Sequence, residues 1–186
     1  MSIKEIIKIT ATVIGREDVV EYLEGKVQTP SQEVVDTVEV MVRLANLVIN
    51  ELACSFIPMK KVEKVVVKDG KVYYKDLSYN PLVILNAYDK NENELSFLVK
   101  NTHVELDSYT AEIEYSFVPP NYTLDQEIGY QEKDISARVL AYGLCAEYAI
   151  TQGCFKDAVM WHKRYEDSVY QACAPKNSTI KERRWA

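Results

Sequence analysis

The chain has 186 residues, of which 47% are hydrophobic and 27% charged, so it can form one globular domain or one core with an inserted lobe. Its formal net charge of −6 excludes a general electrostatic attraction to nucleic acid or to anionic lipid. Thirteen tyrosines stand against four phenylalanines. Tyrosine combines an apolar ring with a polar tip. This excess therefore fits either surfaces that bind other proteins or ordinary positions in sheets and at the edge of the core.

The N-terminal sequence has no signal-peptide pattern, and the chain has no apolar run long enough to span a bilayer. We therefore expect a protein that is made and kept in a cytosol. The four cysteines, Cys54, Cys145, Cys154 and Cys173, include no CxxC pair. We expect free thiols that fill small gaps in a reduced protein.

Three helices are predicted at the N-terminal end. Ser2 is placed to cap the first, which ends at Gly15, and a second short helix stops at Gly25. The third is predicted over residues 31–56, with Ser31 as its N-cap and Pro58 beyond its end. Its apolar residues recur at steps of four and three, namely Val34, Val38, Met41, Ala45, Val48 and Leu52. Such a broad stripe packs against more than one neighbour.

The periodicity changes to two in the middle of the chain, which predicts strands over 62–68, 71–75, 82–89, 94–99, 102–106 and 110–117. The Asp69-Gly70 dipeptide favours a tight type I′ hairpin between the first two strands. In the last strand Ala111, Ile113, Tyr115 and Phe117 share one face. That alternation predicts a sheet with one buried and one wetted face.

Two more helices are predicted near the C-terminus. Asp134 is placed to cap the first, and Gly153 ends it. The second begins near Phe155 and presents one stripe of Ala158, Val159, His162, Tyr165, Val169 and Cys173. The two helices form an antiparallel hairpin, in which small residues such as Gly143 let the axes approach closely.

A search for metal and catalytic motifs gives weak candidates. The oxygen-rich segment from Asp89 to Glu94 resembles the start of an EF-hand loop, but position six is Glu94 and position twelve is Lys100, so we predict a polar hairpin turn. His103 is expected on the solvated face of its strand. His162 is expected to be buried or at an interface, with one partner. Neither histidine has a cysteine at zinc-ligand or nucleophile spacing. We therefore predict no metal, no cofactor and no enzymatic activity.

The C-terminal segment differs in charge from the rest of the chain. Lys181, Arg183 and Arg184 precede Trp185, and no apolar pattern ties the segment to a core. It is either a solubilising terminus or a docking tail, because arginine and tryptophan are enriched at binding hot spots. Nucleic-acid binding is a third alternative, but one short basic stretch gives few phosphate contacts. We predict a tail that binds an acidic neighbouring protein.

Together these patterns predict an α+β fold with a helical core, an inserted antiparallel β lobe and an extended C-terminal tail. The helical core comprises residues 1–58 and the C-terminal hairpin region 119–174. The β lobe comprises residues 59–118, and the docking tail residues 175–186.

The order of these elements resembles the head-to-tail connector proteins of tailed phages, also called adaptor or head-completion proteins. Four segments carry the resemblance: "LANLVINELACSFIPM", "VVVKDGKVYYKDL", "ISARVLAYGLCAEYAITQGCFKDAVMWHKRYEDSVYQAC" and "IKERRW". The resemblance covers nearly the whole chain and lies in its organisation.

This resemblance implies a structural virion protein that is made in the cytoplasm of a host bacterium. It implies a homo-oligomeric ring of about twelve copies beneath the portal protein, joined to the tail or to a further connector protein. Genome DNA would pass through the ring without sequence-specific binding, and no membrane would be involved. The alternative is a bacterial or phage enzyme or ligand-binding module with an unrecognised pocket.

Overall fold

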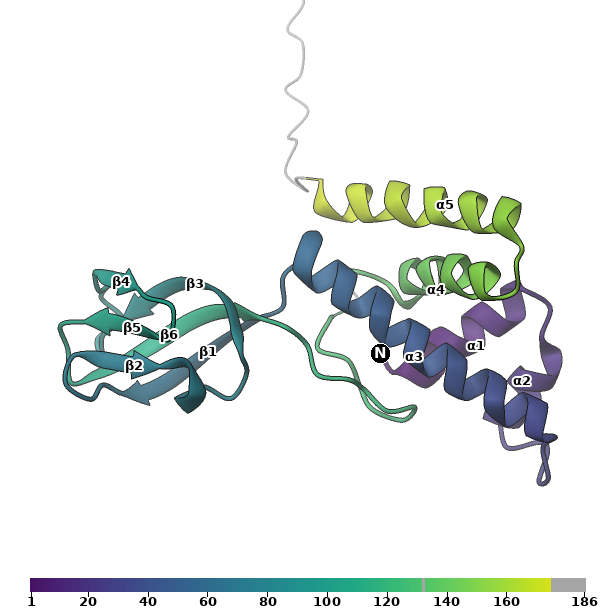
Figure 1. Ribbon diagram of the computed structural model, residues 1–186, viewed down its shortest axis with the longest axis horizontal. Helices are drawn as coiled ribbons and strands as arrows, with labels where there is room; N and C mark the ends of the chain where they lie inside the picture. The colour runs from purple at the N-terminus through teal and green to yellow at the C-terminus, as the bar shows by residue number, and fades with distance from the viewer. Residues whose placement is uncertain (132, 175–186) are drawn as a thin grey trace, which may run out of the picture.

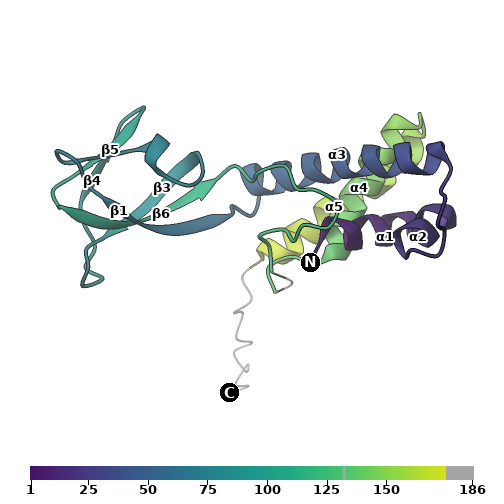
Figure 2. The same ribbon diagram turned by 90° about the horizontal axis from the view of Figure 1, so that it is seen from below.

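The computed structural model describes residues 1–131 and 133–174. It is an α+β protein in which a helical body and a β lobe lie side by side along the long axis (Figures 1 and 2). The chain enters the lobe after the third helix and returns after the last strand. The predicted fold class is therefore confirmed for the described residues, while the predicted tail over 175–186 lies outside them.

The N-terminal helices begin where the sequence predicts. Helix α1 spans Ile3–Val13, and its N-cap Ser2 accepts a hydrogen bond from Glu5 N at 3.2 Å. Helix α2 spans Glu17–Leu23. Helix α3 spans Gln32–Ser55 and is capped by Ser31, whose Oγ accepts from Val34 N. The predicted apolar stripe of α3, from Val34 to Leu52, is buried throughout.

The C-terminal hairpin consists of α4, Ala137–Thr151, and α5, Phe155–Cys173. The predicted cap at Asp134 is wrong, because α4 begins only after Ser136. Residues 133–134 instead form a turn, in which Asp134 N and Ile135 N both donate to Gln131 O. Gly153 ends the first helix as predicted, with a positive φ of 73°.

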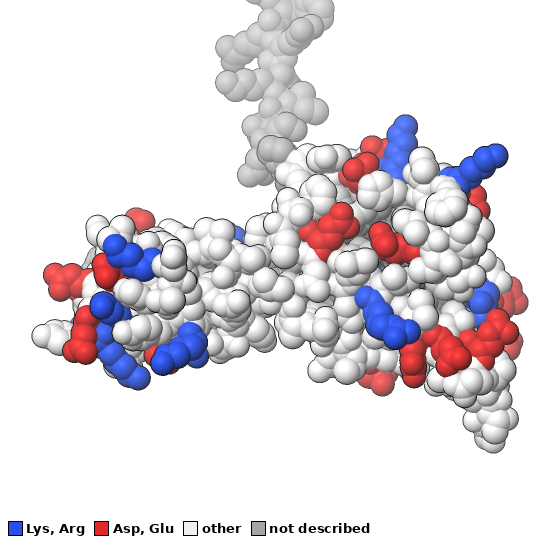
Figure 3. Space-filling view, viewed as in Figure 1, with Lys and Arg blue, Asp and Glu red and all other residues white. Residues whose placement is uncertain are grey.

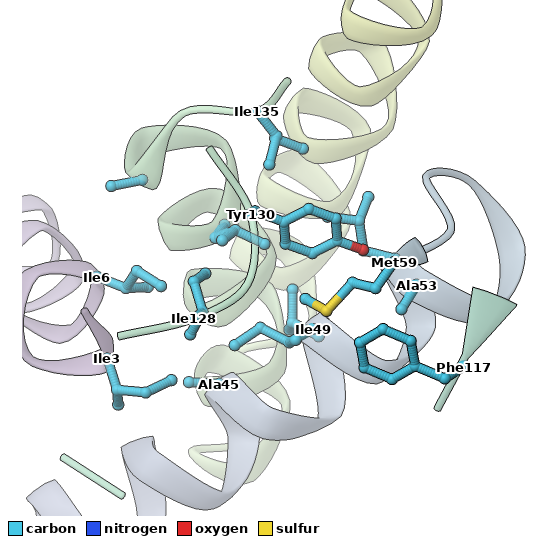
Figure 4. Close-up of a cluster of buried hydrophobic side chains, with 14 of the residues drawn as sticks. Ile3, Ile6, Ala45, Ile49, Ala53, Met59, Phe117, Ile128, Tyr130 and Ile135 are labelled. Carbon is cyan, nitrogen blue, oxygen red and sulfur yellow. The ribbon is translucent and has the colours of Figure 1, made fainter. Parts of the chain in front are cut away.

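Helix α4 lies at the centre of the helical body and contacts α1, α3 and α5. Figure 1 shows α5 on the far side of α4 from α1 and α3. The core continues to the junction with the lobe, where Ile49, Met59, Ile128 and Tyr130 are packed together (Figure 4). One hydrophobic core therefore connects the helices to the base of the lobe.

The described strands of the lobe form two three-stranded antiparallel sheets, ordered β1-β6-β3 and β2-β5-β4. The first contains β1 Lys60–Val66, β6 Thr110–Phe117 and β3 Pro81–Tyr88. The second contains β2 Lys71–Tyr73, β5 His103–Leu106 and β4 Phe97–Val99. A short 3₁₀ helix, η1 Tyr74–Asp76, follows β2.

The predicted hairpin at Asp69-Gly70 is correct at its turn and wrong along its strands. Both turn residues have positive φ, and Lys68 and Lys71 exchange two backbone hydrogen bonds of 2.9 Å. Beyond this pair the strands separate, because β1 pairs with β6 and β2 pairs with β5. The predicted buried face of β6 is confirmed, but Ser116 on its opposite face is buried too.

Candidate interaction surfaces

A groove of about 550 Å³ lies where the helical body meets the β lobe, and we call it the junction groove. Its apolar wall includes Met59, Phe117 and Tyr130, and Figure 4 shows the Met59 side chain near the rings of the other two. Tyr79 stacks on Phe117 with ring centroids 4.3 Å apart. Lys61 lies over the Tyr79 ring at 4.8 Å and adds positive charge to this aromatic wall.

The carboxylate of Glu63 on β1 anchors the wall of the junction groove. Ser78 N donates to it at 2.9 Å, the hydroxyls of Ser78 and Tyr115 also donate to it, and Lys61 Nζ lies 3.2 Å away. Burial alone would raise the pKa of Glu63, but these donors stabilise the ionised form more strongly and lower the pKa to about 2. Glu63 therefore stays charged at neutral pH and holds the loop that carries Tyr79 against β1.

The two histidines lie in different environments. His103 shares a face with Glu105 as predicted, but its side chain is only 16% exposed, so the prediction of a solvated ring is wrong. Its ring lies against Tyr73, and its Nε2 is 3.2 Å from Glu105 Oε1. His162 is half-exposed, so it is not buried within the described chain, and it has a partner in Glu166, one helical turn away at 3.5 Å.

Among the cysteines, Cys145 is buried, and its burial raises the pKa of the thiol to about 12. Cys54, Cys154 and Cys173 are exposed, so the prediction that the thiols fill small gaps is wrong for these three, although all four are free as predicted. Within residues 1–131 and 133–174, no three His, Cys, Asp or Glu side chains are grouped so that they could hold a metal ion.

The EF-hand-like segment is a polar hairpin turn, as predicted. Asp89 Oδ1 accepts hydrogen bonds from Asn91 N at 2.7 Å and from Asn93 N at 2.9 Å. Glu92 adopts a positive φ of 63° within the same turn. The Asp89 carboxylate therefore closes the loop on its own backbone.

Three exposed apolar side chains on α5, Phe155, Val159 and Tyr170, were not expected; we call this set the α5 stripe. Their exposed fractions are 67%, 71% and 61%. The sequence pattern placed Val159 inward with Tyr165, but only the neighbouring stripe of Ala158, Tyr165 and Val169 is buried. The spacing of Phe155 and Val159 was the available signal, because residues four apart share a helix face.

A second exposed apolar surface lies on the outer face of the sheet β1-β6-β3. Val62, Val66 and Val83 are each more than half exposed. Ion pairs between lysines of β1 and glutamates of β6 lie among them, at 3.6 Å for Lys60 with Glu114 and at 2.9 Å for Lys64 with Glu112. This face, which we call the outer sheet face, combines valines with a charged ladder.

The charges are unevenly distributed along the chain. Residues 1–58 and 119–174 contain 17 acidic and 10 basic residues, whereas residues 175–186 contain four basic and one acidic. Figure 3 shows acidic side chains clustered over part of the helical body. The predicted partner-binding residues Lys181, Arg183, Arg184 and Trp185 lie outside the described residues.

A scan against protein-family models finds no match to this chain, and a search of curated proteins finds no significant match. Across the described residues, no helix combines the length and the apolar character needed to cross a membrane. The fold and its surfaces define an α+β protein with two lobes and with exposed apolar surface on both.

Proposed function

We propose that the chain is a structural subunit of a tailed-phage virion: a head-to-tail adaptor that forms a ring, docks on the portal protein and links it to the tail or the next connector. The ring would line the channel for genome DNA without reading its sequence. The resemblance of the element order to connector proteins motivates the proposal, and it supplies the expected copy number of about twelve.

The observation that carries the proposal is the presence of two separate apolar surfaces, the α5 stripe and the outer sheet face, on different parts of one chain. Monomeric proteins seldom leave large apolar patches uncovered. Subunits of a cyclic ring meet through two different surfaces, because each contact is head to tail. A subunit with one contact surface on each lobe suits that geometry.

Within this proposal the tail over residues 175–186 binds a neighbouring protein, with the portal as its expected partner. Arg183 and Arg184 would form charge-assisted pairs with carboxylates, and Trp185 would fill an apolar groove. Deletion of residues 176–186 tests the idea. We expect the truncated protein to join portal-bearing heads poorly, and normal yields of infectious particles would contradict a clamping role.

The ring itself is tested by a substitution on the α5 stripe. Val159→Glu should leave the melting temperature nearly unchanged, because Val159 is exposed, and should reduce incorporation into particles. Gln171→Glu is the matched control, since it adds the same single negative charge at an exposed position on a different face of the same helix. The decisive measurement is copy number in the assembled particle by electron microscopy. A single copy or a two-fold dimer there would rule the ring out.

The junction groove supports a second candidate, a ligand-binding module. Its volume of about 550 Å³ falls within the usual range for small-molecule sites, and its wall is aromatic with lysine at its rim. A screen of small aromatic carboxylates by thermal shift tests this candidate. A compound that stabilises the wild type but not the Tyr79→Ala variant would favour the ligand-binding module over the purely structural role.

A further inference from the structure

Two arginines and two aromatic side chains are stacked on one another across the C-terminal helical hairpin. Tyr142 of α4 stacks on Trp161 of α5, with ring centroids 5.8 Å apart and ring planes 22° apart. The guanidinium carbon of Arg138 lies 5.7 Å from the Tyr142 ring centroid, and that of Arg164 lies 5.0 Å from the Trp161 ring. Both rings are half-buried, and both arginines are exposed. We call these four residues the arginine–aromatic stack.

The two positive charges of this stack have no carboxylate partner in the described part of the chain. No ion pair and no side-chain hydrogen bond of residues 1–131 and 133–174 engages the guanidinium of Arg138 or Arg164. Arg138 also lies in the first turn of α4, where the helix dipole disfavours a cation. The stability of α4 therefore does not explain an arginine at this position. Both guanidinium groups can instead bind carboxylates of another molecule.

The composition of the arginine–aromatic stack suits a protein partner with an acidic surface. Tryptophan, tyrosine and arginine are the side chains most enriched at binding hot spots. Stacking orders the four side chains before a partner arrives, so docking costs less conformational entropy than it would with mobile side chains. Duplex DNA is a weaker match, because two arginines provide few phosphate contacts and the chain carries a net charge of −6. Carboxylates on a protein surface are therefore the complementary groups.

The helical body carries such an acidic surface where α2 and the start of α3 lie together. Glu17 and Glu21 are exposed one turn apart on α2, and Glu33 is exposed in the first turn of α3. We call these three residues the acidic end, and Figure 3 shows acidic side chains gathered there. The neighbouring cation, Arg16, pairs with Asp18 at 2.9 Å and lies 3.6 Å from Glu33. Within the described chain, no ion pair engages Glu17 or Glu21.

We propose that the arginine–aromatic stack binds the acidic end of a second copy of this chain. Charge complementarity identifies the occupant: two unpaired guanidinium groups lie on one surface, two unpaired carboxylates lie on another, and no ion pair joins these surfaces within the described chain. A contact between two different surfaces is head to tail and can repeat from copy to copy around a ring. In this contact Arg138 and Arg164 pair with carboxylates of the neighbour, and the aromatic rings lose their remaining exposure.

This inference rests on the proposed function in one respect, which is the presence of neighbouring copies. It adds a charged contact to the apolar surfaces of the proposed ring, and it involves neither the C-terminal tail nor the junction groove. Charged contacts of this kind select the partner and its orientation, whereas the apolar surfaces do not distinguish one neighbour from another. The stack would therefore determine which end of the next subunit is accepted.

Charge reversal in the full-length protein tests the contact. The stack variant Arg138→Glu/Arg164→Glu should self-associate at least about tenfold more weakly in sedimentation equilibrium, because attraction across the interface becomes repulsion. Its melting temperature should not fall, since an acidic residue in the first turn of α4 suits the helix dipole. The control Lys75→Glu/Lys90→Glu makes the same change in net charge at two exposed positions of the β lobe, and it should associate like the wild type.

Mixing two variants tests which surfaces meet. The acidic-end variant Glu17→Lys/Glu21→Lys should also lose self-association, but it keeps an intact stack, whereas the stack variant keeps an intact acidic end. An equimolar mixture should therefore form one-to-one complexes that do not grow further, because one competent contact remains. Glu21→Lys alone gives the same test with a milder change, since a lysine in the last turn of α2 suits the helix dipole.

Four results would overturn the proposal. They are a wild-type protein that stays monomeric at every concentration, unchanged self-association of the stack variant, a mixture that forms no complexes, and binding of a labelled DNA duplex that the stack variant loses. The last result would assign the arginines to phosphates. Copy number in the particle tests the ring separately. A ring that persists with the stack variant would overturn this contact and leave the proposed function standing.

Discussion

Asn46 of α3 and Tyr122 of the returning chain form two hydrogen bonds with each other. Asn46 Nδ2 donates to Tyr122 O at 2.9 Å, and Tyr122 N donates to Asn46 Oδ1 at 2.7 Å. Asn46 is buried within an otherwise apolar helix face, so its amide replaces the backbone partners that Tyr122 lacks in a non-strand segment. This pair positions the segment that leads from β6 to α4.

Asn46→Ala should therefore destabilise the protein by about 1–3 kcal/mol, because both Tyr122 backbone groups lose their partner in a buried site. Urea denaturation measures the change. Asn50→Ala, one turn further along α3, is the control. Asn50 Oδ1 is buried and has no hydrogen-bond partner among the described residues, so its removal should cost less. Equal losses for the two variants would show that the Asn46 hydrogen bonds contribute little.

Gly143 of α4 lies in close contact with both α3 and α5. A Cβ atom at this position would lie 2.7 Å from Val48 Cγ1 and 3.1 Å from the Tyr165 ring. Gly143→Ala should destabilise by about 1–3 kcal/mol through overpacking, partly offset by the higher helix propensity of alanine. Gly129→Ala is a matched control, because its new methyl group would meet the flexible Met59 thioether at 3.3 Å. Thermal unfolding should show a lower melting temperature for Gly143→Ala than for Gly129→Ala. A Gly143→Ala variant more stable than the wild type would contradict the close contact of α4 with α3 and α5.

Leu52 and Leu47 lie on opposite sides of α3, the first fully buried and the second 53% exposed. Leu52→Ala should lower the free energy of unfolding by about 2–5 kcal/mol, since it removes buried carbon and leaves a cavity. Leu47→Ala should change it by less than about 0.5 kcal/mol. Denaturation midpoints of the two variants check which face of α3 forms the core.

Glu63 should make stability depend on pH in the acid range. Its folded pKa of about 2 lies below the ordinary value of about 4.3 for glutamate, so the stabilisation is present above that value and is lost as the pH falls towards 2. The stability gap between the wild type and Glu63→Gln should therefore narrow from pH 6 to pH 3. Tyr115→Phe, which removes one donor to Glu63, should lose stability at pH 7, whereas Tyr109→Phe at a 91% exposed position should not. A gap that is constant with pH would contradict the anchoring role.

The four thiols should divide into two classes. Cys54, Cys154 and Cys173 are exposed and should react readily with a disulfide reagent. Cys145 should react only when the protein unfolds, because burial blocks access and raises the pKa of its thiol to about 12. Titration with the disulfide reagent, with and without denaturant, counts the thiols in each class. Rapid reaction of all four groups in the native protein would indicate that α4 opens easily.

Local interactions explain why much of the fold could be predicted. Ser2 and Ser31 cap helices through contacts within three residues, and the positive φ of Gly153 ends α4 next to it in the chain. The alternation in β6 likewise identifies its buried face without knowledge of its partners. Asp134 shows where this reasoning fails, since a turn closed by Gln131 O delays the start of α4. The candidate tail residues remain a prediction, because they lie outside the described residues.

The amino-acid sequence by itself determined the helices, the tight turn at Asp69-Gly70 and the period-two strands, because each depends on neighbours within a few residues. The tertiary structure alone decided that β1 pairs with β6, since the turn constrains only Lys68 and Lys71 and burial across the sheet selects the distant partner. It also decided that Val159 is exposed beside the buried Tyr165. Apolar spacing identifies a helix face, but the number of neighbours that cover the face depends on how distant segments pack.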